Sequence, residues 1–193
     1  MTAQTAAQTQ IPGAGDPSPD VTIQTLDGGL VAISDLWRQA VHCLALVFLR
    51  HYGCSFCMEH ARELERHNAE FEEAGIAVGL VGCGSLDEAV AFRDQLDLTT
   101  SLYNDPERAT YRAFGLSETT TGTVLNPRVV AGGIRALAKG HVPRRSSGNP
   151  LQLQGQFLID GAGIIRSVSR PRLMSDIPSA YTLLEDARKL RQS

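Results

Sequence analysis

The sequence predicts an α/β domain with a mixed central sheet, and three observations lead to that fold class. The runs 41–49 and 76–82 are almost continuously apolar, which is typical of strands buried on both faces. Helical patterning separates these two runs and also follows the second. Two further extended runs, 156–159 and 164–169, are joined by a short turn and form a hairpin. Strand–helix alternation closed by a hairpin combines parallel and antiparallel strands in one layered sheet.

The first elements of this domain follow from local signals. Residues 21–23 and 30–33 are extended runs around a turn at 27–29, which indicates a hairpin-like opening. After the first buried run, a helix is expected over 55–74, and Gly75 is placed to end it. The apolar face of that helix carries Ala61, Leu64 and Phe71.

Helix-start signals mark the next elements. Ser85 and Glu88 form a capping-box pattern that begins a helix. Its apolar face holds Ala89, Phe92 and Leu96. A short strand is expected at 101–103. The pair 105–106, Asp then Pro, is typical of an N-cap and a first helical residue, and the helix that it begins ends at Gly115.

The last helices carry similar signals. An Asn-Pro pair at 126–127 predicts a helix to about residue 139, which Gly140 ends. A final helix is expected over 178–190. Its inward-facing residues are Tyr181, Leu184 and Ala187.

Length and composition limit the function classes. The 193 residues, 42% of them hydrophobic, suffice for one sizeable core, so we expect one domain over 21–193 with an insertion at about 116–154. The net charge of −3 argues against nucleic-acid binding by the chain as a whole. No apolar run approaches the roughly 20 residues that a membrane helix needs. Residues 1–20 predict a disordered N-terminal arm without the features of a secretory signal, so a cytoplasmic location is expected.

Two of the four cysteines form a C-x-x-C pair where the first buried strand gives way to a helix. Gly53 precedes Cys54, and Cys57 follows one helical turn later, close enough for a disulfide. The amide groups at a helix N-terminus stabilise a thiolate, which can lower a cysteine pKa to roughly 3.5–7.5. In a reducing compartment, C-x-x-C beside a β-α-β pattern predicts a thioredoxin-like redox site, in preference to two incidental cysteines.

The other two cysteines carry less information. Cys43 lies near the start of its strand and is expected to be a small buried hydrophobe. Cys83 ends the second buried strand and should reach the same sheet edge as the C-x-x-C pair. Three roles stay open for Cys83: a third redox thiol, a metal ligand or a small structural residue.

Each polar residue near the C-x-x-C pair has two possible roles, one functional and one structural. Arg50 and His51 directly precede the loop and can hold a thiolate electrostatically, and His60 lies one turn after Cys57. The alternative for each is a solvated or otherwise satisfied side chain, which we favour for both histidines and leave open for Arg50.

A basic stretch lies inside the predicted insertion. Between Thr119 and Ile159 the chain has no carboxylate but five basic residues: Arg128, Arg135, Lys139, Arg144 and Arg145. The stretch is either a lid or docking surface for an acidic partner or anionic substrate, or a solvated helix and loop. No aromatic residues interleave with the charges, which argues against nucleic-acid binding.

Three segments together resemble a known family. They are 50–59, with its Arg-x-x-Gly-Cys-x-x-Cys-x-Glu pattern, the strand 151–160 and the arginine-containing tail 169–172. The chain resembles the peroxiredoxin-like, selenoprotein U-like branch of the alkyl hydroperoxide reductase and thiol-specific antioxidant superfamily over about residues 20–191. The resemblance implies a thioredoxin-like fold with a helical insertion before the last hairpin. It also implies thiol-dependent redox chemistry on peroxides, endoperoxides or disulfides.

The sequence departs from true peroxiredoxins at positions that the resemblance identifies. Their Pro-x-x-x-Thr-x-x-Cys pattern ends at Cys57 here, with Arg50 at the proline position and Cys54 at the threonine position. Gln154 stands where the peroxide-polarising arginine is expected, and Gly155 where thioredoxins have a cis-proline. These changes shift the expectation from a general peroxidase toward disulfide or specialised peroxide substrates.

Three functions are compatible with these sequence features. The first is a thiol oxidoreductase without a bound cofactor, in which one cysteine attacks and the other resolves. A thioredoxin-like protein or a low-molecular-weight thiol would regenerate it. The second is an iron–sulfur or other metal-binding protein with Cys54 and Cys57 as ligands. It needs further ligands, from Cys83 or from a homodimer that shares two pairs. The third is a non-catalytic adaptor that uses the basic insertion.

Overall fold

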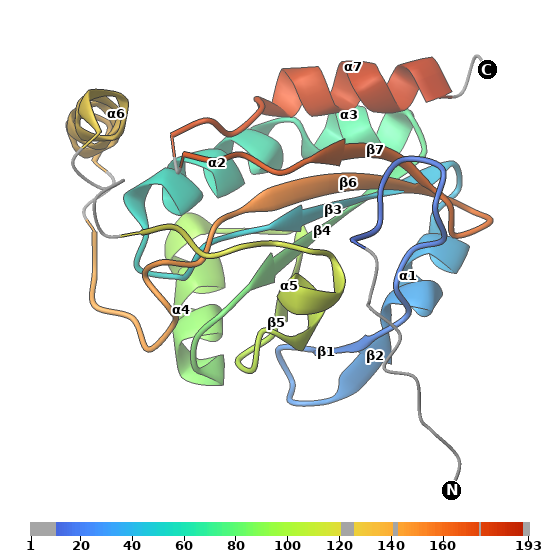
Figure 1. The fold of residues 1–193 in the computed structure, drawn as a ribbon, viewed down its shortest axis with the longest axis horizontal. Helices are drawn as coiled ribbons and strands as arrows, with labels where there is room; N and C mark the ends of the chain where they lie inside the picture. The colour runs from blue at the N-terminus through green and yellow to red at the C-terminus, as the bar shows by residue number, and fades with distance from the viewer. Residues whose placement is uncertain (1–10, 121–125, 141–142, 174, 191–193) are drawn as a thin grey trace, which may run out of the picture.

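The computed structural model describes residues 11–120, 126–140, 143–173 and 175–190, which form a seven-stranded sheet flanked by helices (Figure 1). The strand order is β2-β1-β5-β4-β3-β6-β7. The strands are β1 (Thr22–Gln24), β2 (Leu30–Ala32), β3 (Cys43–Phe48), β4 (Ile76–Gly82), β5 (Ser101–Asn104), β6 (Gly155–Asp160) and β7 (Ile165–Ser169). The helices are α1 (Ile33–Gln39), α2 (Ser55–Arg66), α3 (Asn68–Glu73), α4 (Leu86–Leu96), α5 (Ala109–Ala113), α6 (Pro127–Ala138) and α7 (Ala180–Leu190). None of the described helices is long and apolar enough to cross a membrane.

The sheet is mixed, as the sequence predicts. Strands β3, β4 and β5 are parallel, and β6 pairs antiparallel with β3 so that Gly155 lies opposite Phe48. The carboxyl ends of β3 and β4 and the start of β6 therefore meet at one edge of the sheet. In open α/β sheets this edge is where ligands and chemistry concentrate.

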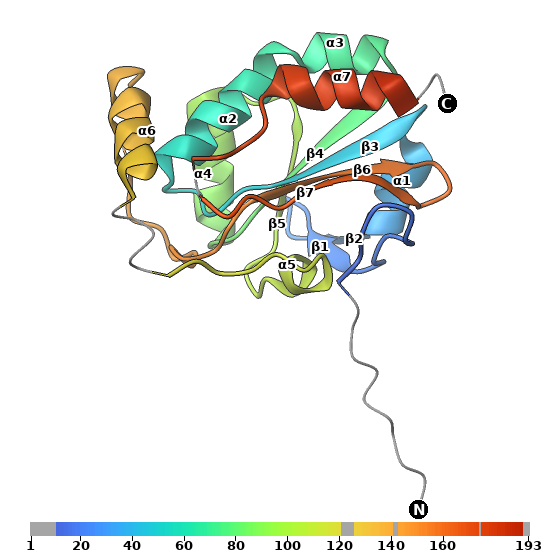
Figure 2. The ribbon, with the colours of Figure 1, turned by 45° about the horizontal axis from the view of Figure 1, so that its top comes forward.

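Helices cover both faces of the sheet, and β3 contributes alternate side chains to each core (Figure 2). Cys43, Ala45 and Val47 pack with residues of α2, α3, α4 and α7. Leu44, Leu46 and Phe48 pack on the other face with residues of α1 and α5. All six residues of β3 are buried, which explains the uninterrupted apolar run in the sequence.

Two predicted helices begin or end differently from the expectation. The helix expected over 55–74 is divided into α2 and α3 at His67, whose backbone (φ −100°, ψ 7°) leaves the helical region. The helix expected from Pro106 begins at Ala109 instead. Asp105 still caps it, because its carboxylate accepts hydrogen bonds from the amides of Ala109 (3.1 Å) and Thr110 (2.7 Å). The capping box of Ser85 and Glu88 is confirmed at the start of α4.

One helix and one inward-facing residue differ from the expectation. Helix α1 was not expected, because its first residue, Ile33, continues an extended run. Its buried residues Ile33, Leu36 and Trp37 nevertheless have helical spacing. In α7, Leu184 and Ala187 are buried as expected, but Tyr181 is 60% exposed and Leu183 packs inward in its place.

The predicted disordered arm is wrong for residues 11–20, whereas 1–10 lie outside the described residues. Gly15 donates to the carbonyl of Ile165 (2.8 Å), Ile165 donates to Asp16 (3.0 Å), and Ser18 donates to Gly163 (2.8 Å). Backbone pairing along the closing hairpin therefore fixes a segment that has few apolar side chains. Amino-acid composition alone cannot predict such pairing, because every non-proline residue has the backbone groups that form it.

Candidate active site

The C-x-x-C pair lies where the sequence places it, between the end of β3 and the start of α2. Cys54 is the N-cap residue of α2, with extended backbone angles, and Cys57 lies in the first turn. Both are free thiols, 4% and 1% exposed. Helix α2 contacts both α4 and α6, and its first turn lies near them in Figures 1 and 2. The two sulfurs thus sit at the sheet edge, under a cover of other chain segments.

Arg50 is the residue that ties the pair together. Its guanidinium Nη1 donates to the Cys54 Sγ (3.3 Å), and its backbone amide donates to the Cys57 Sγ (3.2 Å). The Nε donates to the carbonyl of Gln152 (3.0 Å), and Nη2 donates to the carbonyl of Pro150. Only 5% of Arg50 is exposed, so its charge is compensated from within the protein.

The two cysteines have opposite acid–base character. The pKa of Cys54 is lowered to about 6 by a hydrogen bond from the Cys57 side chain and by the positive charge of Arg50, against the effect of burial. Burial, followed by the hydrogen bond with Cys54 and the charge on Cys54, raises the pKa of Cys57 well above its ordinary value. At neutral pH, Cys54 is therefore the thiolate and Cys57 the protonated thiol.

Residues 143–153, the end of the predicted insertion, cover the pair, and we call them the covering segment. The amide of Arg144 donates to the carbonyl of Gly53 (3.0 Å). A Cβ atom at Gly53 would lie only 2.1 Å from the Arg144 carbonyl oxygen, so a side chain cannot fit there. This close approach explains why a glycine precedes Cys54.

Glu88 fastens the covering segment from the outside. Its carboxylate accepts hydrogen bonds from the Ser147 amide (2.7 Å), the Ser147 hydroxyl (2.7 Å) and the Ser146 hydroxyl (3.2 Å), besides capping α4 through Ser85. The sequence identified Glu88 only as a capping residue. Its second role depends on a contact across 58 or 59 positions, for which the sequence carries no local signal.

Cys83 reaches the same sheet edge, as expected, but as a hydrogen-bond donor. Its Sγ donates to the carbonyl of Arg50 (2.8 Å), and burial raises its pKa to about 11. It is therefore protonated and supports the Arg50 backbone. Cys43 is fully buried at the far end of β3, and burial raises its pKa to about 11 as well, in agreement with a structural role.

Gln154 and Gly155 lie on the other side of Cys57. Both line a narrow apolar crevice with Cys57 and His60. The Gln154 amide donates to the Leu173 carbonyl (3.2 Å), whereas its oxygen is buried without a partner among the described residues. The neutral amide supplies no positive charge at the position where a peroxiredoxin would have one.

His51 and Tyr52 lie in the loop between β3 and α2. Burial and the charge of Arg50 lower the pKa of His51 to about 4, so the imidazole is neutral and does not support a thiolate by charge. Tyr52 was not identified from the sequence. Its hydroxyl donates to the Asn104 side chain (2.9 Å), and its ring packs against Phe92 of α4.

The basic residues of the insertion divide into two groups. Arg135 and Lys139 on α6 form ion pairs with Glu59 of α2, at 3.7 and 2.5 Å. Arg144 and Arg145 are exposed in the covering segment. The side chain of Arg128 lies outside the described residues. Docking by this surface therefore stays a prediction.

A metal site fits the geometry poorly. Among the described residues, no group of three or more His, Cys, Asp and Glu side chains could hold a metal ion. The guanidinium of Arg50 also lies against Cys54 and would repel a cation bound there.

The sequence is similar to those of several known proteins. The chain is 34% identical over 113 residues to "Thioredoxin-like protein AAED1, chloroplastic" of Arabidopsis thaliana, which covers 56% of this chain but only 45% of that protein. It is 26% identical over 172 residues to "Prostamide/prostaglandin F synthase" of Salmo salar, covering 86% and 82% of the two chains.

Solved structures and a family match extend the comparison. The peroxidoxin BcpB of Mycobacterium tuberculosis superposes with a TM-score of 0.67 at 15% identity, over 94% of this chain and 97% of that one. The fold is therefore thioredoxin-like. The AhpC/TSA family matches residues 14–168, which include both cysteines of the C-x-x-C pair and the whole parallel part of the sheet. The chain belongs to the AhpC/TSA family.

Proposed function

We propose that the protein is a thiol oxidoreductase in which Cys54 is the attacking thiolate and Cys57 the resolving thiol. One observation carries the proposal: the charged guanidinium of Arg50 donates to the Cys54 sulfur, whereas the Cys57 sulfur accepts only from the neutral backbone amide of Arg50. A sulfur with a pKa of about 6 is largely ionised at neutral pH, and the thiolate is the nucleophilic form.

The chemistry follows from that difference. With a peroxide, the Cys54 thiolate attacks one oxygen, the O–O bond breaks, an alcohol or water leaves after taking up a proton, and a sulfenic acid remains. With a disulfide, the same thiolate displaces one thiolate and forms a mixed disulfide. Cys57 then attacks the Cys54 sulfur, the intramolecular disulfide forms, and water or the second thiol leaves. An external thiol, protein or small molecule, reduces the pair again.

The substrate class is narrower than for a general peroxidase. Cys54 is buried under the covering segment, and neither a threonine nor an arginine stands at the positions that a peroxiredoxin uses to orient and cleave peroxide. Gln154 leaves that side of the pocket uncharged. We propose a disulfide or a specialised peroxide, including an endoperoxide, and the name of the Salmo salar relative supports the last class. A cytoplasmic setting and a homodimer stay predictions.

The iron–sulfur alternative has a direct test of its own. It needs ligands that the described part of one chain does not bring together, and a cation must tolerate Arg50. Freshly purified protein should show no visible absorption if the cysteines are reagents, whereas a cluster is coloured. The non-catalytic adaptor predicts that neither cysteine traps an intermediate.

Trapping with serine variants tests the proposed roles. Cys57→Ser should accumulate a mixed disulfide or a sulfenic acid at Cys54, which mass spectrometry identifies. Cys54→Ser should accumulate neither. A sulfenic acid at Cys57 of the Cys54→Ser variant, formed with peroxide at an undiminished rate, would reverse the assignment.

A further inference from the structure

A crevice behind the active site connects Cys57 with a second titratable residue. Cys57 and His60 lie one turn apart on α2, and both side chains line this crevice with residues from β3, β6 and the segment before α7. Among the described residues that line it, they are the only titratable side chains. The remaining walls are apolar or carry the neutral amides of Gln154 and Gln156.

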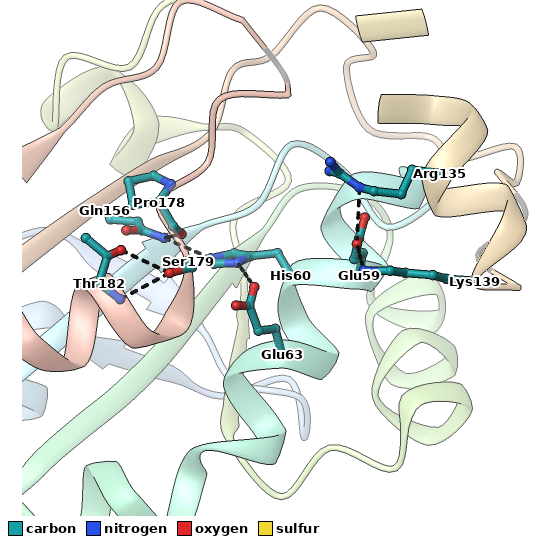
Figure 3. Close-up of polar contacts among 9 residues, drawn as sticks. All are labelled: Glu59, His60, Glu63, Arg135, Lys139, Gln156, Pro178, Ser179 and Thr182. Atoms are coloured by element: carbon teal, nitrogen blue, oxygen red, sulfur yellow. Dashed lines mark hydrogen bonds and ion pairs between the residues drawn. The ribbon is translucent and has the colours of Figure 1, made fainter. Parts of the chain in front are cut away.

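The hydrogen bonds around His60 show which ring nitrogen is an acceptor (Figure 3). The amide nitrogen of Gln156 donates to the Pro178 carbonyl (3.2 Å) and lies 2.8 Å from the Nε2 of His60. Because the carbonyl can only accept, the amide nitrogen is the donor to the ring as well. Nε2 is therefore a free-base nitrogen, and the ring proton is on Nδ1.

The other side of the imidazole faces a carboxylate at the surface. The Nδ1 of His60 lies 3.7 Å from the Oε2 of Glu63, which is 33% exposed, whereas His60 is only 5% exposed. The neighbouring His60 lowers the pKa of Glu63. His60 also lines an outer groove with Glu59 and with Arg135 of α6, and these two are ion-paired with each other (Figure 3). The imidazole thus lies between the crevice at Cys57 and this outer groove.

A base beside Cys57 would assist the proposed chemistry. Cys57 is 1% exposed, and burial keeps its thiol protonated, yet it must lose that proton to attack Cys54. Arg50 is a cation at neutral pH, and Cys83 is itself a protonated donor to a carbonyl. Neither can accept the proton.

On the basis of the proposed dithiol function, we propose that His60 accepts the proton of the resolving thiol Cys57 and passes it through Glu63 to solvent. In this step the Cys57 sulfur forms a bond to the Cys54 sulfur, and the group bound to Cys54 leaves with the bonding electron pair. Because Nε2 has a single lone pair, the Gln156 amide must first move off it. The Cys57 proton then moves to this lone pair, and Nδ1 releases its proton to the Glu63 carboxylate. No external oxidant is consumed in this step, because the substrate has already oxidised Cys54.

The resolving step can be followed with a small probe. Methyl methanethiosulfonate converts Cys54 to a methyl mixed disulfide, and Cys57 then displaces methanethiol. Quenched-flow mass spectrometry follows the loss of the adduct, and Cys57→Ser provides the baseline in which it persists. In His60→Gln, capping of Cys54 should keep its rate, and resolution at neutral pH should slow by about 100-fold or more, the usual contribution of a positioned base. The rate should recover as pH rises, because hydroxide then removes the proton.

The chain offers a matched control for this variant. His67 and Glu70 form another histidine–carboxylate pair three residues apart on the same side of the molecule, at 2.7 Å, but His67 does not line the crevice. His67→Gln should resolve at the wild-type rate. Glu63→Gln, at a more exposed site, should fold even if His60→Gln does not, and should slow resolution by a smaller factor at neutral pH.

The outcomes separate this inference from the proposed function. If the wild type forms no adduct at Cys54 or no disulfide, the proposed function fails. If it forms both, but His60→Gln resolves at the wild-type rate or is slowed equally at every pH, His60 is only structural and the relay is wrong. An unchanged rate in Glu63→Gln would remove Glu63 from the path.

Discussion

The guanidinium of Arg50 donates to the Cys54 Sγ over 3.3 Å and, from its other nitrogens, to two backbone carbonyls of the segment that covers that sulfur. One buried cation thus stabilises the thiolate and holds the cover in place. The reactivity of Cys54 and its accessibility are therefore linked through a single side chain.

Replacing Arg50 should weaken both effects. In Arg50→Met the loss of an opposite charge should raise the pKa of Cys54 by about one to three units. Alkylation of Cys54 at pH 6–7 should then slow by about tenfold or more for an equally accessible sulfur. Arg50→Lys should show a smaller rise in the pKa, because it keeps the charge but loses the paired contacts to Pro150 and Gln152. A Cys54 pKa that is unchanged in Arg50→Met would contradict the electrostatic role.

The covering segment should open more easily when Glu88 loses its charge. Glu88→Gln keeps a capping-box residue but weakens charge-assisted hydrogen bonds to Ser146 and Ser147. A loss of about 1 kcal/mol would increase the open population, and the rate of Cys54 alkylation, about fivefold. The Cys54 pKa should stay the same. Asp87→Asn, which removes a charge from the same helical turn, is the control and should leave the rate unchanged.

Gly53 should not tolerate a side chain. Gly53→Ala places a Cβ atom 2.1 Å from the Arg144 carbonyl oxygen, so the covering segment must shift. We expect a loss of about 1–3 kcal/mol in the free energy of unfolding and faster alkylation of Cys54. Gly161→Ala adds the same atom where no described residue other than its chain neighbours lies within 4 Å, and it should change stability by less than about 0.5 kcal/mol. Equal effects of the two variants in chemical denaturation would refute the close contact.

His51 should make the fold acid-sensitive. Its pKa is about 4 in the folded protein against 6.5 as the ordinary value, so the unfolded chain binds a proton first as pH falls. The free energy of unfolding should therefore decrease from about pH 6.5 to about pH 4. At about 1.4 kcal/mol per pKa unit, the upper limit is about 3 kcal/mol. His51→Gln should remove this part of the pH dependence. A wild-type stability that is constant across this range would contradict a lowered pKa of His51 in the folded protein.

Local sequence signals predicted much of this site. The apolar run of β3, the glycine and the C-x-x-C spacing place Cys54 and Cys57 at the start of a helix, because these features depend only on neighbouring residues. Burial of β3 on both faces and the capping box of Ser85 were predicted for the same reason.

Long-range contacts account for what the sequence did not predict. The carbonyls of Pro150 and Gln152 bind Arg50 across about 100 positions, and a carbonyl has no residue-type signature. The pairing of residues 15–18 with the closing hairpin is likewise made by backbone groups. His60 was expected to be a satisfied side chain. Its place beside Cys57 in the crevice depends on β6 packing over α2, which periodicity does not reveal.

The pH dependence of alkylation in the reduced protein tests the central claim most directly. Iodoacetamide, which is small and uncharged, is applied across the range from pH 4 to pH 9, and peptide mass spectrometry measures the rate at each cysteine. Cys54 should be modified first, with a midpoint near its pKa of about 6, while Cys57 should stay unmodified through neutral pH. Preferential modification of Cys57, or a Cys54 midpoint near the ordinary thiol value, would contradict it.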